Sequence, residues 1–248
     1  MDLARPALRP DPGLSREEME RQQRDIAAAA TFTDYIAWPP AKLGEQPLVA
    51  GVDQGFDGDT ATSAAVVLRG ETVVDRAHAT RETEIPYIPG LLSFREGNAV
   101  LAALTSLETD PDVILVDGSG RIHFREAGLA THVGVVLDAP TVGVAKNLLC
   151  GRPSDSLADP LPEGERVAIE ADDGVTAPDG TVIGYAVQTR QYDSGARHIN
   201  PLYVSPGHRV SATTAADIVE RYATGYKLPE PTRLADSYAD EVVTGTDE

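Results

Sequence analysis

The spacing of apolar and polar positions predicts several strands in the first half of the chain. Apolar runs typical of strands cover residues 48–52, 64–68 and 72–79, and Gly70 suits a tight turn between the last two. Residues 112–117 read Asp-Val-Ile-Leu-Val-Asp, and their unbroken apolar centre favours a strand covered on both faces. Further strands are expected at 141–144, 166–170, 182–189 and 202–204. We therefore expect an antiparallel meander that continues into a larger sheet.

Helical spacing alternates with these strands. Ser15 and Glu18 form a capping-box pattern, which opens a helix reaching about Ala30. Residues 94–107 place apolar side chains three and four positions apart. Further helices are expected at 126–136, after Ser211 and within 225–243. The alternation predicts an α/β fold, in which helices flank a mixed β-sheet with parallel crossovers and additional hairpins.

The size of the chain favours one domain. Its 248 residues, 42% of them hydrophobic, have room for one sizeable core. We expect a flexible N-terminal tail at 1–14, a single domain at 15–237 and an acidic C-terminal tail at 238–248. Cys150 is the only cysteine, so the chain has no disulfide framework. Since we find no apolar leader and no stretch of about 18 apolar residues, we expect a cytoplasmic, monomeric protein.

The charge distribution bears on the partner. A formal charge of −18 argues against nucleic acid, because phosphate binding usually leaves a basic surface. However, only three of the 21 basic residues are lysines, against 39 acids. Surfaces rich in acids and poor in lysine suit a cytoplasm at very high salt, where charge is screened within about 3 Å at 1 M. We interpret the acidity as halophilic, and an ordinary acidic protein that avoids nucleic acid is the alternative.

Three acids lie at positions suited to a metal site. Glu96 precedes Val100 by four residues, which places it on the inward stripe of its helix, although an exposed first-turn glutamate is an equal alternative. Asp117 ends an apolar strand, at the edge where open α/β sheets place their sites, and its alternative is a turn-forming Asp-Gly. Asp53 ends the first apolar run. Oxygen ligands without thiolates favour Mg²⁺, with Mn²⁺ as a substitute.

Two further residues suit phosphodiester hydrolysis. His208 is a candidate to orient or deprotonate a water molecule, and Lys146 is a candidate to contact a phosphate oxygen. A surface histidine and a surface lysine are the default alternatives for such isolated residues. Spacing alone does not bring these five residues together.

Seven segments nevertheless resemble one family of nucleases. They read VAGVDQGF (49–56), PYIPGLLSFRE (86–96), ILVDGSGRIH (114–123), GLATHVGVVLDAPTVGVAK (128–146), IGYAVQTR (183–190), VSPGHRVS (204–211) and GYKLPEPTRLAD (225–236). In this order they are similar to the endonuclease V family, which repairs deaminated bases, and the resemblance as a whole covers roughly residues 15 to 236. The resemblance implies a ribonuclease H-like fold with one metal-dependent active site.

The resemblance also implies roles for individual residues. Asp53, Glu96 and Asp117 match the metal-binding acids, with Lys146 and His208 beside the scissile phosphate. Arg125 is expected, with Lys146, to contact phosphate. The wedge that separates the DNA strands corresponds to Pro86, Tyr87, Ile88 and Pro89, although PYIP alone would read as a rigid turn. The hypoxanthine pocket corresponds to Gly90, Leu92, Gly118, Gly120, His123 and Leu129.

One position departs from the family pattern. The family commonly has a proline between the histidine and arginine of this loop, whereas this chain has Phe124 between His123 and Arg125. Phe124 lacks the fixed φ angle of a proline, so the backbone constrains His123 and Arg125 less than in the family pattern.

The function implied is that of a DNA repair endonuclease that recognises deoxyinosine. It would cut on the 3′ side, one nucleotide beyond the lesion, and leave 3′-OH and 5′-phosphate ends. An endoribonuclease specific for inosine in RNA is the first alternative. A nucleic-acid-binding module without activity is the second, and a phosphotransferase is weaker, because no Gly-rich phosphate loop ending in Lys-Ser/Thr occurs.

Overall fold

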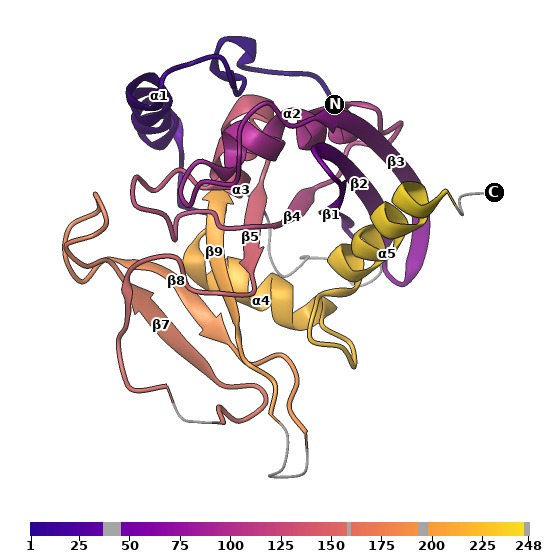
Figure 1. The fold of residues 1–248 in the computed structure, drawn as a ribbon. Coiled ribbons are helices and arrows are strands. Elements are labelled where there is room, and N and C mark those ends of the chain that lie inside the picture. The colour runs from indigo at the N-terminus through magenta and orange to yellow at the C-terminus, as the bar shows by residue number, and fades with distance from the viewer. Residues whose placement is uncertain (37–45, 158–159, 193–197, 246–248) are drawn as a thin grey trace.

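The computed structural model describes residues 1–36, 46–157, 160–192 and 198–245, and within these ranges it contains one mixed sheet flanked by helices (Figure 1). The strand order in the described sheet is β3-β2-β1-β4-β5-β9-β8-β7-β6. The strands are β1 (Leu48–Asp57), β2 (Thr60–Arg69), β3 (Thr72–Glu82), β4 (Val113–Asp117), β5 (Thr141–Ala145), β6 (Arg152–Pro153), β7 (Arg166–Glu170), β8 (Val182–Val187) and β9 (Leu202–His208). The predicted α/β fold class is confirmed.

Five α-helices and one short 3-10 helix are described alongside this sheet. They are η1 (Pro6–Leu8), α1 (Arg16–Ala29), α2 (Leu92–Thr105), α3 (Leu129–Leu137), α4 (Ala212–Tyr222) and α5 (Glu230–Thr244). The predicted capping box opens α1, since the Ser15 side chain accepts from the Glu18 N–H and the Glu18 side chain accepts from the Ser15 N–H. No helix in the described ranges is long and apolar enough to cross a membrane.

The topology brings the carboxyl ends of three parallel strands to one edge. β4 pairs in parallel with both β1 and β5, while β1, β2 and β3 form the predicted antiparallel meander. β9 is antiparallel to β5, and β8 and β7 continue the sheet in antiparallel order. Residues that follow β4 and β5 therefore share an edge with the middle of the longer β1.

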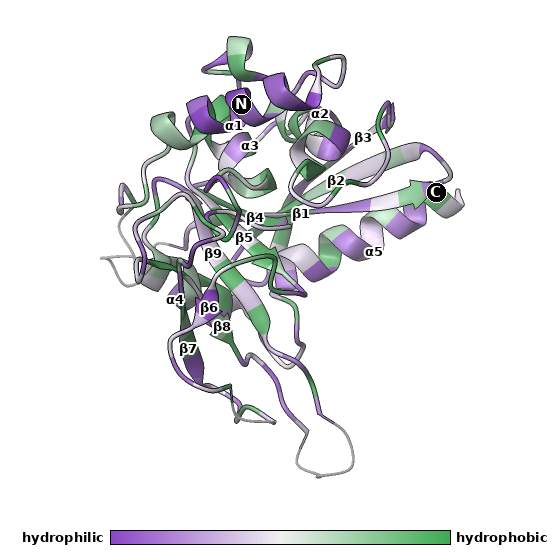
Figure 2. Ribbon diagram, turned by 60° about the vertical axis from the view of Figure 1, so that its left-hand side comes forward, coloured by the Kyte–Doolittle hydropathy of each residue, from purple (hydrophilic) through white to green (hydrophobic). Residues whose placement is uncertain are grey.

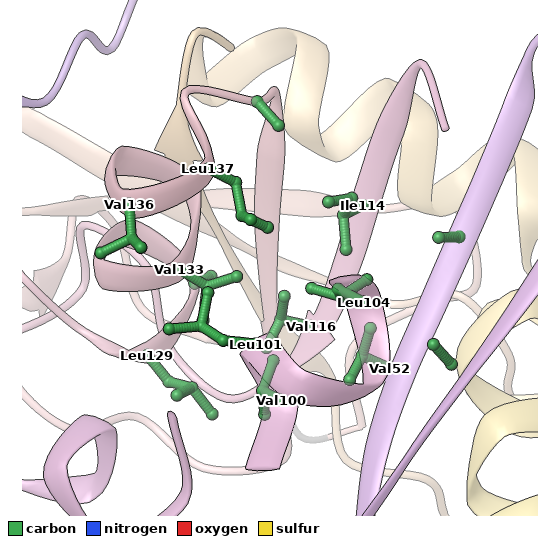
Figure 3. Packing of buried hydrophobic residues seen from close by; sticks show 14 of the residues in the cluster. Val52, Val100, Leu101, Leu104, Ile114, Val116, Leu129, Val133, Val136 and Leu137 are labelled. Carbon is green, nitrogen blue, oxygen red and sulfur yellow. The ribbon is translucent and has the colours of Figure 1, made fainter. Parts of the chain in front are cut away.

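Helices cover both faces of the sheet. α2 and α3 pack over one face, where alternate residues of β1 and β4, such as Val52 and Val116, meet Val100, Leu104 and Val133 (Figure 3). On the other face α4 packs on the opposite residues of β4, β5 and β9, and α5 lies along β1 and β2 (Figures 1 and 2). Because both faces are covered, the central strands are apolar throughout, as the unbroken run before Asp117 predicts.

Helix α5 lies directly on the backbone of β1. A Cβ atom on Gly51 would overlap the backbone of Pro231 and Thr232, and one on Gly55 would meet Val243 Cγ2 at 3.0 Å. Two glycines on the same face of β1 therefore allow the helix to approach the strand closely. This contact places the middle of α5 over the strand position between them, which is Asp53.

The structure corrects the predicted N-terminal tail. Residues 1–14 pack on α3 instead of forming a flexible segment: the Arg5 Nη1 donates to Val135 O at 2.7 Å and to Asp138 Oδ1 at 3.1 Å. The side chain of His132 is hydrogen-bonded to Leu8 O at 2.8 Å. These contacts join segments far apart in the chain, which local spacing does not reveal.

Two helix boundaries also differ from the prediction. α3 begins at Leu129 instead of position 126, because Glu126 has a φ of 53°, outside the helical region. α5 continues to Thr244, so most of the predicted acidic tail at 238–248 is helical, and its last three residues lie outside the described ranges. Tyr238 and Ala239 are buried against the sheet, which explains why the helix continues.

Candidate active site

Two aspartates lie side by side on β1 and β4. Val52 pairs with Val116 in parallel register, so the next residues, Asp53 and Asp117, are neighbours across the two strands. Side chains alternate along a strand, so both aspartates point away from α2 and α3 and towards the face that α5 covers. This register brings together two of the three acids that the family resemblance implies for the metal site.

Asp53 is buried without full compensation. Its side chain is 4% exposed; Oδ1 accepts from the Gln54 N–H at 2.7 Å, and Oδ2 has no hydrogen-bond partner among the described residues. Burial, together with the negative charge of Asp117, raises the pKa of Asp53 to about 9. Without a cation, the protonated form of Asp53 is therefore favoured at neutral pH.

Glu96 approaches the same edge from α2, and its predicted inward orientation is confirmed. The residue is 5% exposed. Burial raises the pKa of Glu96 to about 7, Arg95 opposes this shift and Asp117 adds to it. The guanidinium of Arg95 lies 3.9 Å from the Glu96 carboxylate, donates to Ile85 O at 2.9 Å and lies over the ring of Phe56. Arg95 thus connects Glu96 with the loop that carries the predicted wedge.

Lys146, the residue predicted to contact a phosphate oxygen, lies beside Asp117. It follows β5 directly, and its Nζ donates to Asp117 Oδ2 at 3.2 Å. Partial burial opposes the charge of the lysine, but the charges of Asp117 and Asp53 outweigh burial and raise the pKa of Lys146. The side chain remains half exposed, so its ammonium group is accessible to a phosphate.

Asp236 on α5 is a fourth carboxylate of this cluster, and the sequence prediction missed it. It lies between the helix positions that contact Gly51 and Gly55, and its negative charge contributes to the raised pKa of Lys146. Helical spacing gave no chemical signal for this residue. The available signal was its place as the last residue of the matching segment GYKLPEPTRLAD.

The donor set of this cluster suits a divalent cation. Within the described ranges, no three acidic, histidine or cysteine side chains are close enough to form a complete ligand set. The oxygens of Asp53, Asp117 and Glu96 are nevertheless the hard ligands that Mg²⁺ and Mn²⁺ prefer. The unpaired Oδ2 of Asp53 is also unusual, because buried polar atoms normally have partners. A cation beside this atom would satisfy it and reduce the repulsion from Asp117.

His208 does not belong to the acidic cluster, which corrects the prediction. It ends β9 and pairs with Thr141 at the start of β5, whereas Lys146 follows the other end of β5. Its Nδ1 accepts from the Thr31 N–H at 3.1 Å, and its Nε2 lies 3.2 Å from Asp138 Oδ1. The histidine lies at the end of a strand that runs away from the site.

A pocket of about 340 Å³ adjoins the cluster. It is lined by Asp117 and Lys146 at one side and by the loop around Tyr87 at the other. Five of the six residues predicted for the hypoxanthine pocket line it: Gly90, Leu92, Gly118, His123 and Leu129. Gly120 does not, because it faces β9, where a Cβ atom would overlap the Pro206 backbone. Its predicted place in the pocket is wrong, and its small size serves backbone packing.

The predicted wedge segment forms an exposed loop at the rim of this pocket. Tyr87 is 66% exposed, and Pro86 and Pro89 are exposed on either side. Ile88 is half buried and packs with Leu91 and its apolar neighbours below the loop. The loop therefore has a buried anchor and presents an aromatic ring to solvent.

The loop after His123 differs from its predicted use. The guanidinium of Arg125 is taken up by α1: its Nε donates to Gln23 Oε1 at 2.7 Å, and its Nη2 lies 3.7 Å from Glu20 Oε1. Arg125 is therefore engaged within the protein, and its predicted phosphate contact is corrected. Phe124 packs against Gly90, where a Cβ atom would lie 3.0 Å from the Phe124 ring. The aromatic ring supports the pocket wall in place of the family's rigid proline.

Comparison with known proteins relates this arrangement to one family. A family model described as Endonuclease V matches residues 34–237. The chain is 64% identical over 259 residues to the endonuclease V of Haloarcula marismortui, a haloarchaeon, and the match covers 96% of each chain.

Solved structures share the fold. The crystal structure of endonuclease V from Streptomyces avermitilis has a TM-score of 0.77 and 33% sequence identity, over 98% of each chain. The Ciona intestinalis enzyme, crystallised with a 24mer DNA containing an inosine followed by a ribo-adenosine, has a TM-score of 0.71 and 25% identity. That match covers 93% of this chain and 98% of the other.

The raised pKa of Asp53 predicts how stability depends on pH without divalent metal. The folded-state pKa of about 9 lies above the unfolded value of about 3.9, so the stabilising protonated form is lost as the pH rises through this window. Asp53→Asn removes this loss. We expect the melting temperature of the wild type to fall relative to that of Asp53→Asn between pH 5 and pH 9 in EDTA.

The same measurement tests metal binding. Mg²⁺ or Mn²⁺ should raise the melting temperature of the wild type at pH 8 and leave that of Asp53→Asn nearly unchanged. Parallel pH profiles of the two proteins in EDTA would contradict the assigned burial and coupling of Asp53.

Proposed function

Because this chain belongs to the endonuclease V family and is a DNA repair endonuclease of that type, we propose that it recognises deoxyinosine and cuts beside it. The bond hydrolysed is one nucleotide beyond the lesion on the 3′ side, and the products carry 3′-OH and 5′-phosphate ends. The lesion base itself stays attached to its sugar.

The observation that carries this proposal is the shared boundary between the pocket and the acidic cluster. Asp117 and Lys146 line the pocket and also form the ion pair of the cluster. A base turned out of the duplex into the pocket therefore brings its own backbone to the carboxylates. The pocket suits one base, because a wall of backbone and small residues permits close hydrogen-bond reading of its edge.

The loop at the pocket rim is suited to act as a wedge between the DNA strands. A stacked base cannot be read on its pairing edge, so it must leave the helix, and the gap is then filled by an apolar group. Tyr87 is the exposed ring beside the pocket, and the half-buried Ile88 anchors its loop. We therefore assign Tyr87 to the space left by the everted base.

The residues of the cluster have different roles in hydrolysis. Asp53 and Asp117, with Glu96 directly or through water, would hold Mg²⁺ or Mn²⁺. The cation would supply Lewis-acid stabilisation of the phosphate and lower the pKa of a bound water. The ammonium group of Lys146 is half exposed beside Asp117 and is placed to bind a phosphate oxygen. Since His208 lies elsewhere, we assign the orientation of the attacking water to Asp236.

Inosine in RNA remains the second candidate substrate. The Ciona intestinalis complex contains a ribo-adenosine after the inosine, so that enzyme accommodates at least one ribonucleotide. The choice between DNA and RNA is therefore tested by the assay described next.

The acidic surface also enters the proposal. The relative from a haloarchaeon supports the interpretation that the charge of −18 keeps the protein hydrated at high salt. DNA binding by such a protein depends less on long-range attraction, since salt screens it, and more on contacts within the pocket and at the wedge. Activity should accordingly persist in molar KCl.

The central assay uses matched oligonucleotides with a single deoxyinosine, a single riboinosine or neither, in Mg²⁺ at low and at molar KCl. We expect one cut, one nucleotide 3′ of deoxyinosine, and no cut without Mg²⁺. Cutting that ignores the lesion, or no cutting at either salt concentration, would refute the proposal. A preference for riboinosine would select the endoribonuclease function instead.

The role of Asp236 is tested by a matched pair on one helix. Asp236→Asn should slow cutting by about a hundredfold or more, as expected when a positioned catalytic carboxylate is lost. Asp240→Asn, about one turn further along α5 at an exposed position, should leave the rate unchanged. Single-turnover rates at saturating enzyme give the comparison, and equal rates for the two variants would exclude Asp236 from the site.

A further inference from the structure

A closed ring of hydrogen bonds forms part of the pocket wall, since Gln23, Gly90 and His123 all line the pocket. Gln23 of α1 donates from Nε2 to Gly90 O at 2.7 Å, and Arg125 Nε donates to Gln23 Oε1 at 2.7 Å. The Arg125 backbone N–H donates to His123 Nδ1 at 3.1 Å, and His123 Nε2 lies 3.0 Å from Gly90 O. Gln23 is fully buried and His123 is 2% exposed, so water has little access to this ring.

The ring determines the protonation of His123. Because Nδ1 accepts from the Arg125 N–H, the hydrogen of the neutral imidazole is on Nε2, which donates to Gly90 O. Burial lowers the pKa of His123 to about 4, so the neutral form persists at physiological pH. Gly90 O thus accepts two hydrogen bonds, one from His123 and one from Gln23, and both of its lone pairs are used.

The two hydrogen bonds to Gly90 O determine which hydrogen-bonding groups the pocket wall offers to a bound base. Gly90 lines the pocket, and its carbonyl has no lone pair left for a bound base. Next to it, α2 begins at Leu91 without a side-chain cap. The Phe94 N–H donates to Leu91 O, which leaves the N–H groups of Leu92 and Ser93 as the donors of the first turn. Leu92 and Ser93 of this turn line the same pocket. This side of the pocket therefore offers hydrogen-bond donors, and its nearest acceptor is already occupied.

We propose that Gln23 is a positioning residue that sets the base specificity of the pocket by saturating the Gly90 carbonyl. Hypoxanthine has an oxygen at its six-position and can accept from this wall, whereas adenine has an amino group there and would need an acceptor. The amino group of adenine would face the Gly90 carbonyl, which already accepts two hydrogen bonds, and the backbone N–H donors of α2. It would lose its hydrogen bonds with water and gain none from the protein. This inference rests on the proposed recognition of deoxyinosine.

A purely structural role explains Gln23 less well. Met19 and Ile26, four residues before it and three after it, are buried apolar residues on the same face of α1 and already anchor the helix. An apolar side chain at position 23 would continue that stripe without the cost of burying an amide. The amide is instead used completely, with its oxygen bound to Arg125 and its nitrogen bound to Gly90.

Two substitutions separate the two ends of the Gln23 amide. Gln23→Met keeps the volume and removes both hydrogen bonds. Gln23→Glu keeps an acceptor for Arg125 but, when ionised at pH 8, has no hydrogen to donate to Gly90 O. Gln22→Met is the matched control, because Gln22 is the adjacent residue and its amide donates to Arg9 O, away from the pocket.

The readout is the ratio of single-turnover cutting rates at deoxyinosine and at deoxyadenosine in otherwise identical oligonucleotides, in Mg²⁺ at pH 8. Binding of both oligonucleotides without divalent metal is measured in parallel. We expect both Gln23 variants to lower the inosine-to-adenine ratio by about tenfold, the value of one buried hydrogen bond, and Gln22→Met to leave it unchanged. Melting temperatures establish that each variant is folded, and if Gln23→Met is unfolded, Gln23→Glu decides.

The outcomes separate this inference from the function on which it rests. Wild-type protein that does not prefer inosine refutes the proposed function and the inference together. Wild-type preference with an unchanged ratio in both folded Gln23 variants refutes the inference alone. A ratio lost in Gln23→Met but retained in Gln23→Glu would assign the effect to the Arg125 contact and would also overturn the role of Gly90 saturation.

Discussion

The burial of Asp53 beside Asp117 is the constraint on which the rest of the site depends. A carboxylate that is 4% exposed, with one oxygen unpaired and a second carboxylate next to it, is unfavourable in the ionised form. Asp53 is nevertheless buried, because Gly51 and Gly55 allow α5 to pack closely on β1 and because apolar layers cover the strands on both faces. Lys146 compensates part of the negative charge, and a divalent cation beside Asp53 would neutralise the remainder.

Much of the fold follows from local signals in the sequence. The capping box of Ser15 and Glu18, the hairpin at Gly70 and the unbroken apolar strand before Asp117 each reflect one element and its immediate neighbours. Helical spacing placed Glu96 on the face that it shares with Val100, but an exposed first-turn glutamate was an equal alternative, and only its burial in the fold decides between the two. Such signals place the acids on their elements, and the parallel register of β1 and β4 then brings two of them together.

Features that depend on pairing between distant segments were not predictable in the same way. His208 was assigned to the site by its motif, but the antiparallel course of β9 carries it to the far end of β5. Asp236 enters only because α5 packs on β1, and Gln23 only because α1 reaches the wall at Gly90. Position 120 requires a glycine because the backbone of Pro206 in β9 lies where a Cβ atom would be. The sequence alone does not distinguish this packing requirement from close approach to a ligand.

We propose that Asp53 and Asp117 hold a divalent cation at the edge of the pocket. The most direct measurement is anomalous diffraction from crystals soaked in Mn²⁺, because the signal locates the ion without reference to activity. The account predicts a peak between the carboxylates of Asp53 and Asp117, and none at this place in crystals of Asp53→Asn. A Mn²⁺ peak bound elsewhere in the wild type, with this position empty, would contradict it.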